Sequence, residues 1–206
     1  MTKDNPRLDE HLKYLKLPFI REHYQSLATQ AAEKQLAHVD YLEKLADGEA
    51  AFRRDRSIQR RIQQARFPVI KTLEQFNWSW PKKVNRLQVK NLFRLQFVAD
   101  KANVIFLGGV GLGKTHLAAA LGYQACLEGY GVLFATAIDV INTLTAAQAA
   151  GRMKAELKKY TRPAVLILDE LGFLPIDKTG ADLLFQVISL RYEQGALVIT
   201  SNRAFK

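Results

Sequence analysis

The amino-acid sequence predicts an α/β fold in which a parallel sheet flanked by helices follows a small all-helical domain. Residues 1–66 place apolar side chains at helical spacing, whereas residues 102–206 alternate short apolar strands with helices. We therefore expect a helical N-terminal domain over 1–66, a connector over 67–101 and an α/β core over 102–206.

Apolar periodicity indicates the helices of the N-terminal domain. Leu8, Leu12 and Leu15 are spaced i, i+4, i+7, as on one face of a helix. Pro18 is expected to begin a helix that runs to about Lys34, because proline is tolerated in a first turn. The same periodicity continues through Leu27, Ala31, Leu36, Val39 and Leu42.

The second half of this domain combines an apolar stripe with many arginines. Gly48 is expected to mark a break or bend. Beyond it, Ile58, Ile62 and Ala65 form the stripe, and Phe67–Pro68 is expected to end the helix. The arginines of this segment are Arg53, Arg54, Arg56, Arg60, Arg61 and Arg66.

The net charge of +10 lies in the middle of the chain. Residues 52–101 contain 13 lysines and arginines against 3 acidic residues, whereas residues 1–51 and 102–206 carry net charges of −2 and +2. Concentrated positive charge attracts polyanions, of which DNA and RNA are the commonest. We expect the arginine-rich helix to bind DNA, and a solvated helix face is the alternative.

Near-continuous apolar strands in the core indicate burial on both faces, as in a parallel sheet with crossover helices. The aromatic residues Phe76, Trp78 and Trp80 of the connector are expected to pack it onto this core rather than to stack on bases. The expected strands are 104–107, 132–135, 164–168 and 196–200, and the expected helices are 114–128, 138–149 and 179–194.

The segment 108–115 matches the P-loop pattern G-x-x-x-x-G-K-[ST] in full. Its glycines let backbone amides approach phosphate oxygens, and the following helix presents its positive end to them. Lys114 should reach the β- and γ-phosphates of ATP, and the Thr115 hydroxyl should ligate Mg²⁺. A lone histidine in a first helical turn, such as His116, is more often structural than catalytic. The expected nucleotide contacts are Gly108, Gly109, Val110, Gly111, Leu112, Gly113, Lys114, Thr115 and His116.

Two carboxylates follow the apolar strand at 164–168. Asp169 is placed to meet the Mg²⁺ held by Thr115, and Glu170 to act as the general base that activates the attacking water. The last strand leads to Asn202. If that strand lies between the P-loop strand and the Asp169 strand, the Asn202 amide emerges beside the γ-phosphate and can hold the lytic water. A turn-forming asparagine is the alternative.

In this order and spacing, the three motifs resemble those of the AAA+ ATPases. The strings GKTHLAAALG, LDELGFLP, LLFQVISLRYE and ITSNR are similar to the DnaC/IstB branch. The arginine-rich helix followed by RFPVIKTLEQFNW is more like IstB than DnaC, and the resemblance covers nearly all of residues 20–206. It implies a homo-oligomer that assembles on DNA with ATP and assists a transposase, with Lys114, Glu170 and Asn202 as catalytic residues.

The same resemblance implies further segments after Asn202: a fifth core strand, an arginine that completes the neighbouring subunit's site, and a helical lid. The sequence ends at Lys206. We therefore expect an AAA+ core that is incomplete at its C-terminus and hydrolyses ATP barely above background. Arg203 is a poor substitute for the missing arginine, and Arg191 is the next candidate.

Other functions stay open. One is a DnaC-like loader of a replicative helicase, and another is a nucleotide-gated DNA-binding module with little turnover. A small-molecule kinase is remote, because Asp169 and Glu170 are adjacent and the N-terminal domain is basic. No run of eighteen apolar residues predicts a membrane span, and the single Cys126 fits core packing in a reducing cytoplasm.

Overall fold

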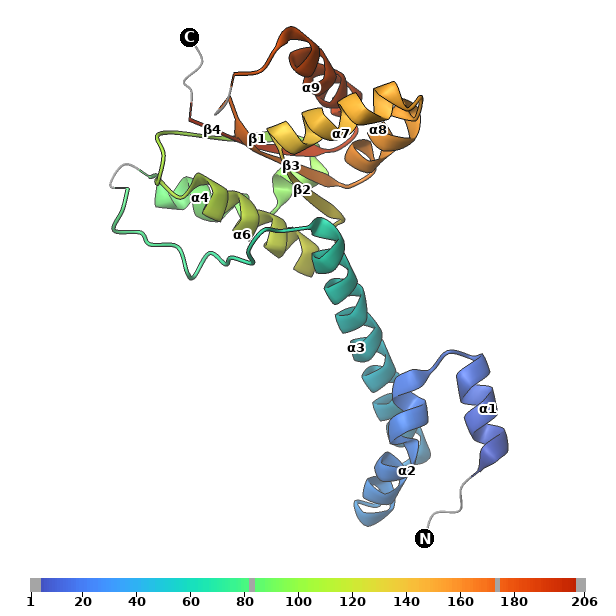
Figure 1. Cartoon of the computed structure of the whole chain (residues 1–206). Coiled ribbons are helices and arrows are strands. Elements are labelled where there is room, and N and C mark those ends of the chain that lie inside the picture. The colour runs from blue at the N-terminus through green and yellow to red at the C-terminus, as the bar shows by residue number, and fades with distance from the viewer. Residues whose placement is uncertain (1–4, 82–83, 173–174, 203–206) are drawn as a thin grey trace. The chain divides into compact units, whose positions relative to one another are not determined.

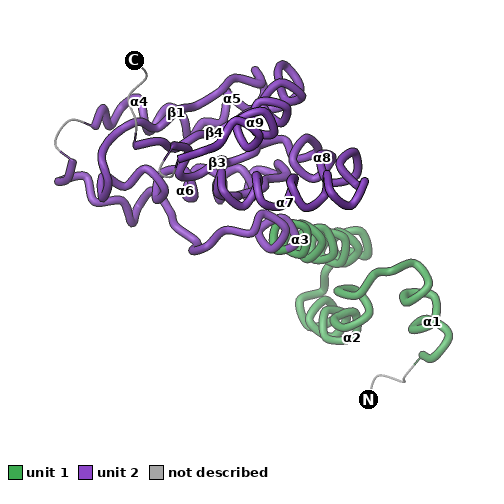
Figure 2. The backbone as a smooth tube through the Cα atoms, turned by 45° about the horizontal axis from the view of Figure 1, so that its top comes forward, with its two compact units in different colours: residues 1–59 green, residues 60–206 purple. Residues whose placement is uncertain are grey.

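The computed structural model describes residues 5–81, 84–172 and 175–202. The chain forms two compact units, residues 1–59 and residues 60–206 (Figure 2). The long helix α3 (His38–Ala65) contributes to both units, and ends just before Phe67 as expected. Residues 67–101, the expected connector, belong to the second unit together with the sheet.

The first unit consists of α1 (Pro6–Tyr14), α2 (Pro18–Glu33) and the beginning of α3 (Figure 1). Helix α2 begins at the expected proline. The buried Glu49 of α3 accepts hydrogen bonds from the backbone N–H groups of Phe19, at 3.0 Å, and Ile20, at 3.2 Å. Its carboxylate thereby pairs the N–H groups that the first turn of α2 leaves without an intrahelical partner.

The predicted break at Gly48 is wrong, because α3 passes through this residue without interruption. The ring of Phe19 occupies the space beside Gly48, where a Cβ would lie 1.9 Å from Phe19 Cε1. Glycine therefore serves the close approach of α2 to α3. The predicted apolar face is also incomplete. Val39 and Leu42 are 74% and 63% exposed, and the buried face of α3 begins at Leu45.

The second unit is built on a four-stranded parallel sheet with the order β1-β4-β3-β2 (Figure 1). Strand β4 therefore lies between β1 and β3, as the interpretation of Asn202 requires. The strands are β1 (Asn103–Leu107), β2 (Val132–Thr136), β3 (Val165–Leu171) and β4 (Ala196–Ser201). The helices are α4 (Arg86–Leu92), α5 (Gln96–Ala99), α6 (Lys114–Leu127), α7 (Ala137–Ala149), α8 (Met153–Thr161) and α9 (Lys178–Arg191). The short helices α4, α5 and α8 were not predicted.

Helices cover both faces of the sheet, and each face has its own hydrophobic core. On one face, Ile167 and Val198 pack with residues of α6. On the other, Leu166 and Leu197 pack with residues of α7 and α9. Neighbouring residues of one strand point to opposite cores, which is why the strands are apolar at nearly every position.

The aromatic residues after α3 form a smaller cluster. Phe76 is buried, and its ring meets those of Trp78 and His116 edge to face, with centroids 5.0 and 5.4 Å apart. The prediction that these residues pack onto the core is correct for Phe76 and Trp78, whereas Trp80 is 59% exposed.

Cys126 of α6 is fully buried in the core, as expected. Burial raises the pKa of its thiol to about 11, because the charged thiolate loses its hydration there. The thiol is therefore a small apolar group of the core. In the described part of the chain, no helix is both long and apolar enough to cross a membrane.

Candidate nucleotide and metal site

The glycine-rich loop joins β1 to α6 at the carboxyl edge of the sheet. Gly111 and Gly113 both have φ of +79°, in the left-handed region that favours glycine. A Cβ at Gly113 would also lie 2.6 Å from Phe76 Cε2. Gly113 is the N-cap of α6, and no side chain of the described residues caps this end of the helix. The first N–H groups of α6 can therefore bind an anion held by the loop.

Two side chains of the first turn of α6 point in different directions. Lys114 Nζ donates to the carbonyl oxygen of Gly109 at 2.7 Å, which holds the ammonium over the loop. His116 Nε2 lies 2.9 Å from the carbonyl oxygen of Thr72, and its ring contacts Phe76. The contacts of His116 thus join α6 to the segment that follows α3, as the structural interpretation of this histidine anticipated.

A network of hydroxyl and carboxylate groups joins α6, β3 and β4. Thr115 Oγ1 donates to Asp169 Oδ1 at 3.0 Å, and Thr200 Oγ1 donates to the same oxygen. Thr200 Oγ1 also accepts from the backbone N–H of Glu170 at 3.0 Å. Asp169 and Thr200 are only 4% and 1% exposed. Sequence reasoning missed Thr200, and the signal was a hydroxyl residue that ends an otherwise apolar strand.

Glu170 has an unusual backbone conformation. Its φ is +60°, although it carries a side chain, and the register between β3 and β4 shifts between Leu168 and Leu171. Such a shift redirects side chains, and a left-handed non-glycine residue costs of the order of 1–3 kcal/mol. The irregularity turns the exposed Glu170 side chain out of the strand and into a cavity beside the loop.

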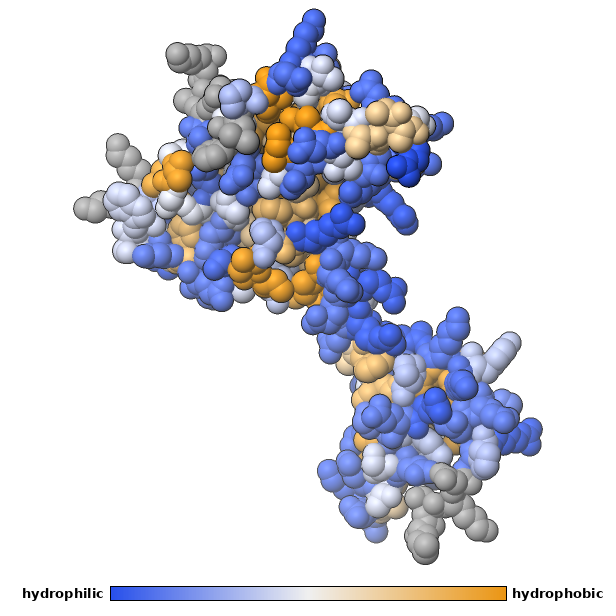
Figure 3. Space-filling model, viewed as in Figure 1, coloured by the Kyte–Doolittle hydropathy of each residue, from blue (hydrophilic) through white to orange (hydrophobic). Residues whose placement is uncertain are grey.

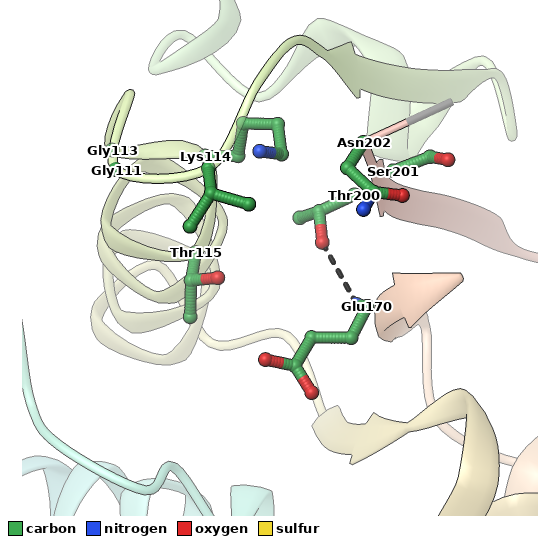
Figure 4. A pocket seen from close by; sticks show the side chains of 9 residues that line it. Gly111, Gly113, Lys114, Thr115, Glu170, Thr200, Ser201 and Asn202 are labelled. Atoms are coloured by element: carbon green, nitrogen blue, oxygen red, sulfur yellow. Dashed lines mark hydrogen bonds between the residues drawn. The ribbon is translucent and has the colours of Figure 1, made fainter. Parts of the chain in front are cut away.

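This cavity has a volume of about 340 Å³ and lies at the carboxyl ends of the strands (Figure 4). Lys114 and Thr115 come from α6, Glu170 from the end of β3, and Asn202 follows β4. The chain thus brings together four residues that the sequence predicted as parts of one site. The other lining residues are Val110, Gly111, Gly113, Thr200 and Ser201.

The oxygen atoms of Thr115 and Asp169 fit a Mg²⁺ ion that is shared with a nucleotide. They lie 3.0 Å apart beside the loop. Mg²⁺ prefers oxygen ligands, and in nucleotide sites one or two protein groups bind it together with phosphate and water. Among the described residues, no three His, Cys, Asp or Glu side chains gather as a protein-only metal site.

Of the predicted DNA-binding arginines, Arg53 and Arg56 have contacts within the first unit, whereas the others are exposed on α3 or line cavities of the second unit. Arg53, in the first unit, donates to Glu49 Oε1 at 2.9 Å and to the carbonyl oxygen of Lys16 at 2.6 Å, so it stabilises the helices there. The guanidinium of Arg56 lies over the ring of Phe52, 5.7 Å from its centroid. Arg54 and Arg60 are exposed on α3, and Arg61 and Arg66 line cavities of the second unit.

Arg191 is not placed to reach a neighbouring subunit's nucleotide, so its suggested role as the trans-acting arginine is wrong. The residue is 2% exposed. Its guanidinium donates to the backbone carbonyl oxygens of residues 160, 161, 163, 164 and 196, at 2.7–3.4 Å. Arg203, the other arginine considered, lies outside the described residues.

Comparison with known proteins identifies one family. The model of the family described as IstB-like ATP binding protein matches residues 10–206. The chain is 39% identical to the ATP-binding protein of insertion sequence IS21 from Pseudomonas aeruginosa, over 96% of this chain and 75% of that protein. It is 36% identical to the ATP-binding protein of insertion sequence IS5376 from Geobacillus stearothermophilus, over 97% and 79%.

Solved structures support the same fold. The DnaC helicase loader is 27% identical with a TM-score of 0.55, over 66% of this chain and 78% of that chain. AMPPCP-bound DnaA from Aquifex aeolicus is 25% identical with a TM-score of 0.56, over 64% of this chain. That region spans only 42% of the DnaA chain, so the likeness concerns part of that protein.

Proposed function

This chain belongs to the family of IstB-like ATP binding proteins, and from that premise we propose that it hydrolyses Mg·ATP, binds DNA as a homo-oligomer and assists a transposase. The family match and the solved structures already give two parts of this description. The chain has an AAA+ fold related to DnaC and DnaA, and it belongs with ATP-binding proteins of insertion sequences. Hydrolysis, DNA and the transposase are the parts that we propose.

The network around Asp169 is the observation that carries the proposed hydrolysis. Thr115 and Asp169 would hold Mg²⁺, which when bound neutralises charge on the β- and γ-phosphates. Lys114 would bind the same phosphates from the start of α6. Thr200 holds the Asp169 carboxylate and the Glu170 backbone in one arrangement, so both are oriented before the nucleotide arrives.

Glu170 is the proposed general base. Its carboxylate would take a proton from the attacking water as the water oxygen bonds to the γ-phosphorus and the bond to the ADP oxygen breaks. Asn202, on the opposite wall of the same cavity, would hold that water by its side-chain amide. The φ of Glu170 supports this assignment, because strained backbone at a cavity wall is typical of functional residues.

The positive charge of the chain supports DNA as a partner, and the names of its relatives support a transposase. The excess of positive charge over residues 52–101 favours a polyanion. Relatives at 36–39% identity are named as ATP-binding proteins of insertion sequences, mobile elements whose movement requires a transposase. We expect the protein to act on DNA in the cytoplasm. A helicase-loading role is the second candidate, favoured by the match to the DnaC loader.

Pull-down with ATP and DNA would separate these functions. Tagged protein is offered the transposase of its own insertion sequence and, separately, the replicative helicase of its host. We expect capture of the transposase only, and its loss in Lys114→Ala, which lacks the charge that binds the phosphates. Capture of the helicase alone would favour the loader. Capture of neither, together with ATP binding and negligible turnover, would favour a nucleotide-gated DNA-binding module.

A further inference from the structure

We propose that a basic groove along the edge strand β2 binds the sugar-phosphate backbone of nucleic acid, and that this contact reaches the ATP site. The inference rests on the DNA binding proposed above, and it assigns that binding to residues of the second unit. The groove is a cavity of about 550 Å³, and a second cavity of about 600 Å³ connects it to the ATP site. Arg66, Leu133 and Lys159 line both of them, so the two cavities adjoin.

The first cavity is strongly positive. Arg61, Arg66, Lys159 and Arg162 line it, and no carboxylate is among the described residues of its wall. Lys159 has a partner in Glu156, at 3.0 Å. For the three arginines, the part of the chain that the structure describes contains no ion pair, in contrast to Arg53 with Glu49. Their charge is therefore available to an external anion.

The fold holds these cations in place. Ala65 is fully buried in the core and Ile62 packs against it, so the end of α3 that carries Arg61 is anchored in this core, and Arg66 follows directly after it. The ring of Phe67 meets that of Phe134 in β2, with centroids 6.2 Å apart. The backbone at these positions is therefore ordered before a ligand binds, and binding orders only the arginine side chains. On the visible face of the C-terminal half of α3, hydrophilic residues predominate (Figure 3).

The wall of the first cavity favours a phosphate backbone over bases. Among the described residues that line it, none is aromatic, so it offers no stacking platform for a base or a lone nucleotide. Guanidinium groups spread along a groove match successive phosphates, and such contacts carry no sequence information. The expected binding is therefore insensitive to sequence and strongly dependent on salt.

The second cavity leads from this groove to the nucleotide. The carboxylates of Asp139, Asp169 and Glu170 line it, and Arg66 and Lys159 are the cations among its described lining residues. Phosphates that engage the two cations change the electrostatic field at the carboxylates of the ATP site. DNA and nucleotide should therefore affect each other's affinity, and coupling of this kind is reciprocal.

The decisive experiment compares two double variants of the whole chain. Arg61→Gln with Arg162→Gln removes charge from the groove, and Lys90→Gln with Arg94→Gln removes equal charge from exposed positions of the same unit that line neither cavity. Fluorescence anisotropy of a labelled duplex is measured over a salt series, with single-stranded DNA and inorganic polyphosphate as further probes. A fluorescent ATP analogue is titrated with and without DNA.

We expect the groove variant to reduce the slope of log K against log salt by about 2, roughly one unit per lost phosphate contact. At a fixed DNA concentration it should also weaken the effect of DNA on the affinity for the ATP analogue, because less DNA is bound beside Arg66 and Lys159, while the control variant retains both. Arg61→Lys with Arg162→Lys should keep most of the slope. If the double variant fails to fold, Arg162→Gln alone should reduce the slope by about 1.

Three outcomes would overturn the inference. In the first, the groove variant keeps the wild-type slope and affinity, and mutation of Arg54 and Arg60 abolishes DNA binding. This result would place the contact on the exposed face of α3. Binding of polyphosphate but not of either DNA would make the groove a site for small anions. A wild-type chain that binds no DNA would instead contradict the proposed function itself.

Discussion

The two edges of the parallel sheet each carry a polar cluster, and the clusters differ in what they leave unpaired. At the carboxyl edge, Asp169, Thr200 and Glu170 are linked by hydrogen bonds, but the Glu170 carboxylate opens to a cavity. At the amino edge, the Arg191 guanidinium is buried and donates to five backbone carbonyl oxygens. The Glu170 carboxylate is therefore free to bind and react at the cavity, whereas the buried Arg191 guanidinium, whose Nε alone among its nitrogens lacks a hydrogen bond within the described part of the chain, serves stability.

The largest expected effect tests the open edge. Glu170→Gln should lower ATP hydrolysis to the uncatalysed background, because an amide does not accept the proton of the attacking water and a general base contributes roughly 10²–10⁴-fold. Binding of a fluorescent ATP analogue and the free energy of unfolding should change little. Glu193→Gln is the matched control, since Glu193 is also exposed and has a left-handed backbone, with φ of +55°. Wild-type turnover in Glu170→Gln would move the base elsewhere.

At the amino edge of the sheet, replacing Arg191 should lower the stability of the fold. Arg191→Met leaves several buried carbonyl oxygens without a donor, and each such loss costs about 1–3 kcal/mol. We expect the free energy of unfolding in urea to fall by at least about 3 kcal/mol. At temperatures where the variant stays folded, the nucleotide affinity should be retained. Arg152→Met, at an exposed position, is the control. A loss below about 1 kcal/mol would show that the carbonyl oxygens find other partners.

Thr200 belongs to the cluster at the carboxyl edge, but its hydroxyl already joins Asp169 to Glu170, so its loss should affect catalysis less than the loss of the Glu170 carboxylate. Thr200→Val keeps the branched shape and removes the hydroxyl that joins Asp169 to the Glu170 backbone. We expect kcat to fall by about tenfold, the effect of losing a hydrogen bond to a charged group. Steady-state kinetics would show this with KM little changed. Thr161→Val removes a hydroxyl that bonds within α8 and should be silent. A normal kcat in Thr200→Val would contradict its positioning role.

The smallest effect concerns the backbone of Glu170. At φ of +60°, alanine is strained by about 1–2 kcal/mol and glycine is not. Glu170→Gly should therefore unfold at a higher urea concentration than Glu170→Ala, by about 1 kcal/mol in free energy. The same pair at Glu193 serves as a reference outside the site. Equal stability of the two Glu170 variants would mean that β3 relaxes once the side chain is lost.

Much of the fold could be predicted because it is encoded locally. Each strand of the sheet is a contiguous apolar run, and the described strands begin and end within a few residues of those expected. The helices α4 and α5 were missed because seven and four residues are too few to show helical periodicity. Gly48 was misread because only its neighbour Phe19, far away in the chain, explains a glycine there.

The sequence by itself determined the candidate phosphate site, because eight consecutive residues carry both the loop conformation and the chemistry that a phosphate requires. Tertiary structure alone decided the rest. The strand order places β4 beside β3, so Thr200 reaches Asp169 from 31 positions away in the chain. Packing of the end of α3 on β2 separates Arg61 and Arg66 from Arg53, and burial turns Arg191 into a structural residue. Such pairings depend on which distant segments meet, and contiguous patterns in a chain do not carry that information.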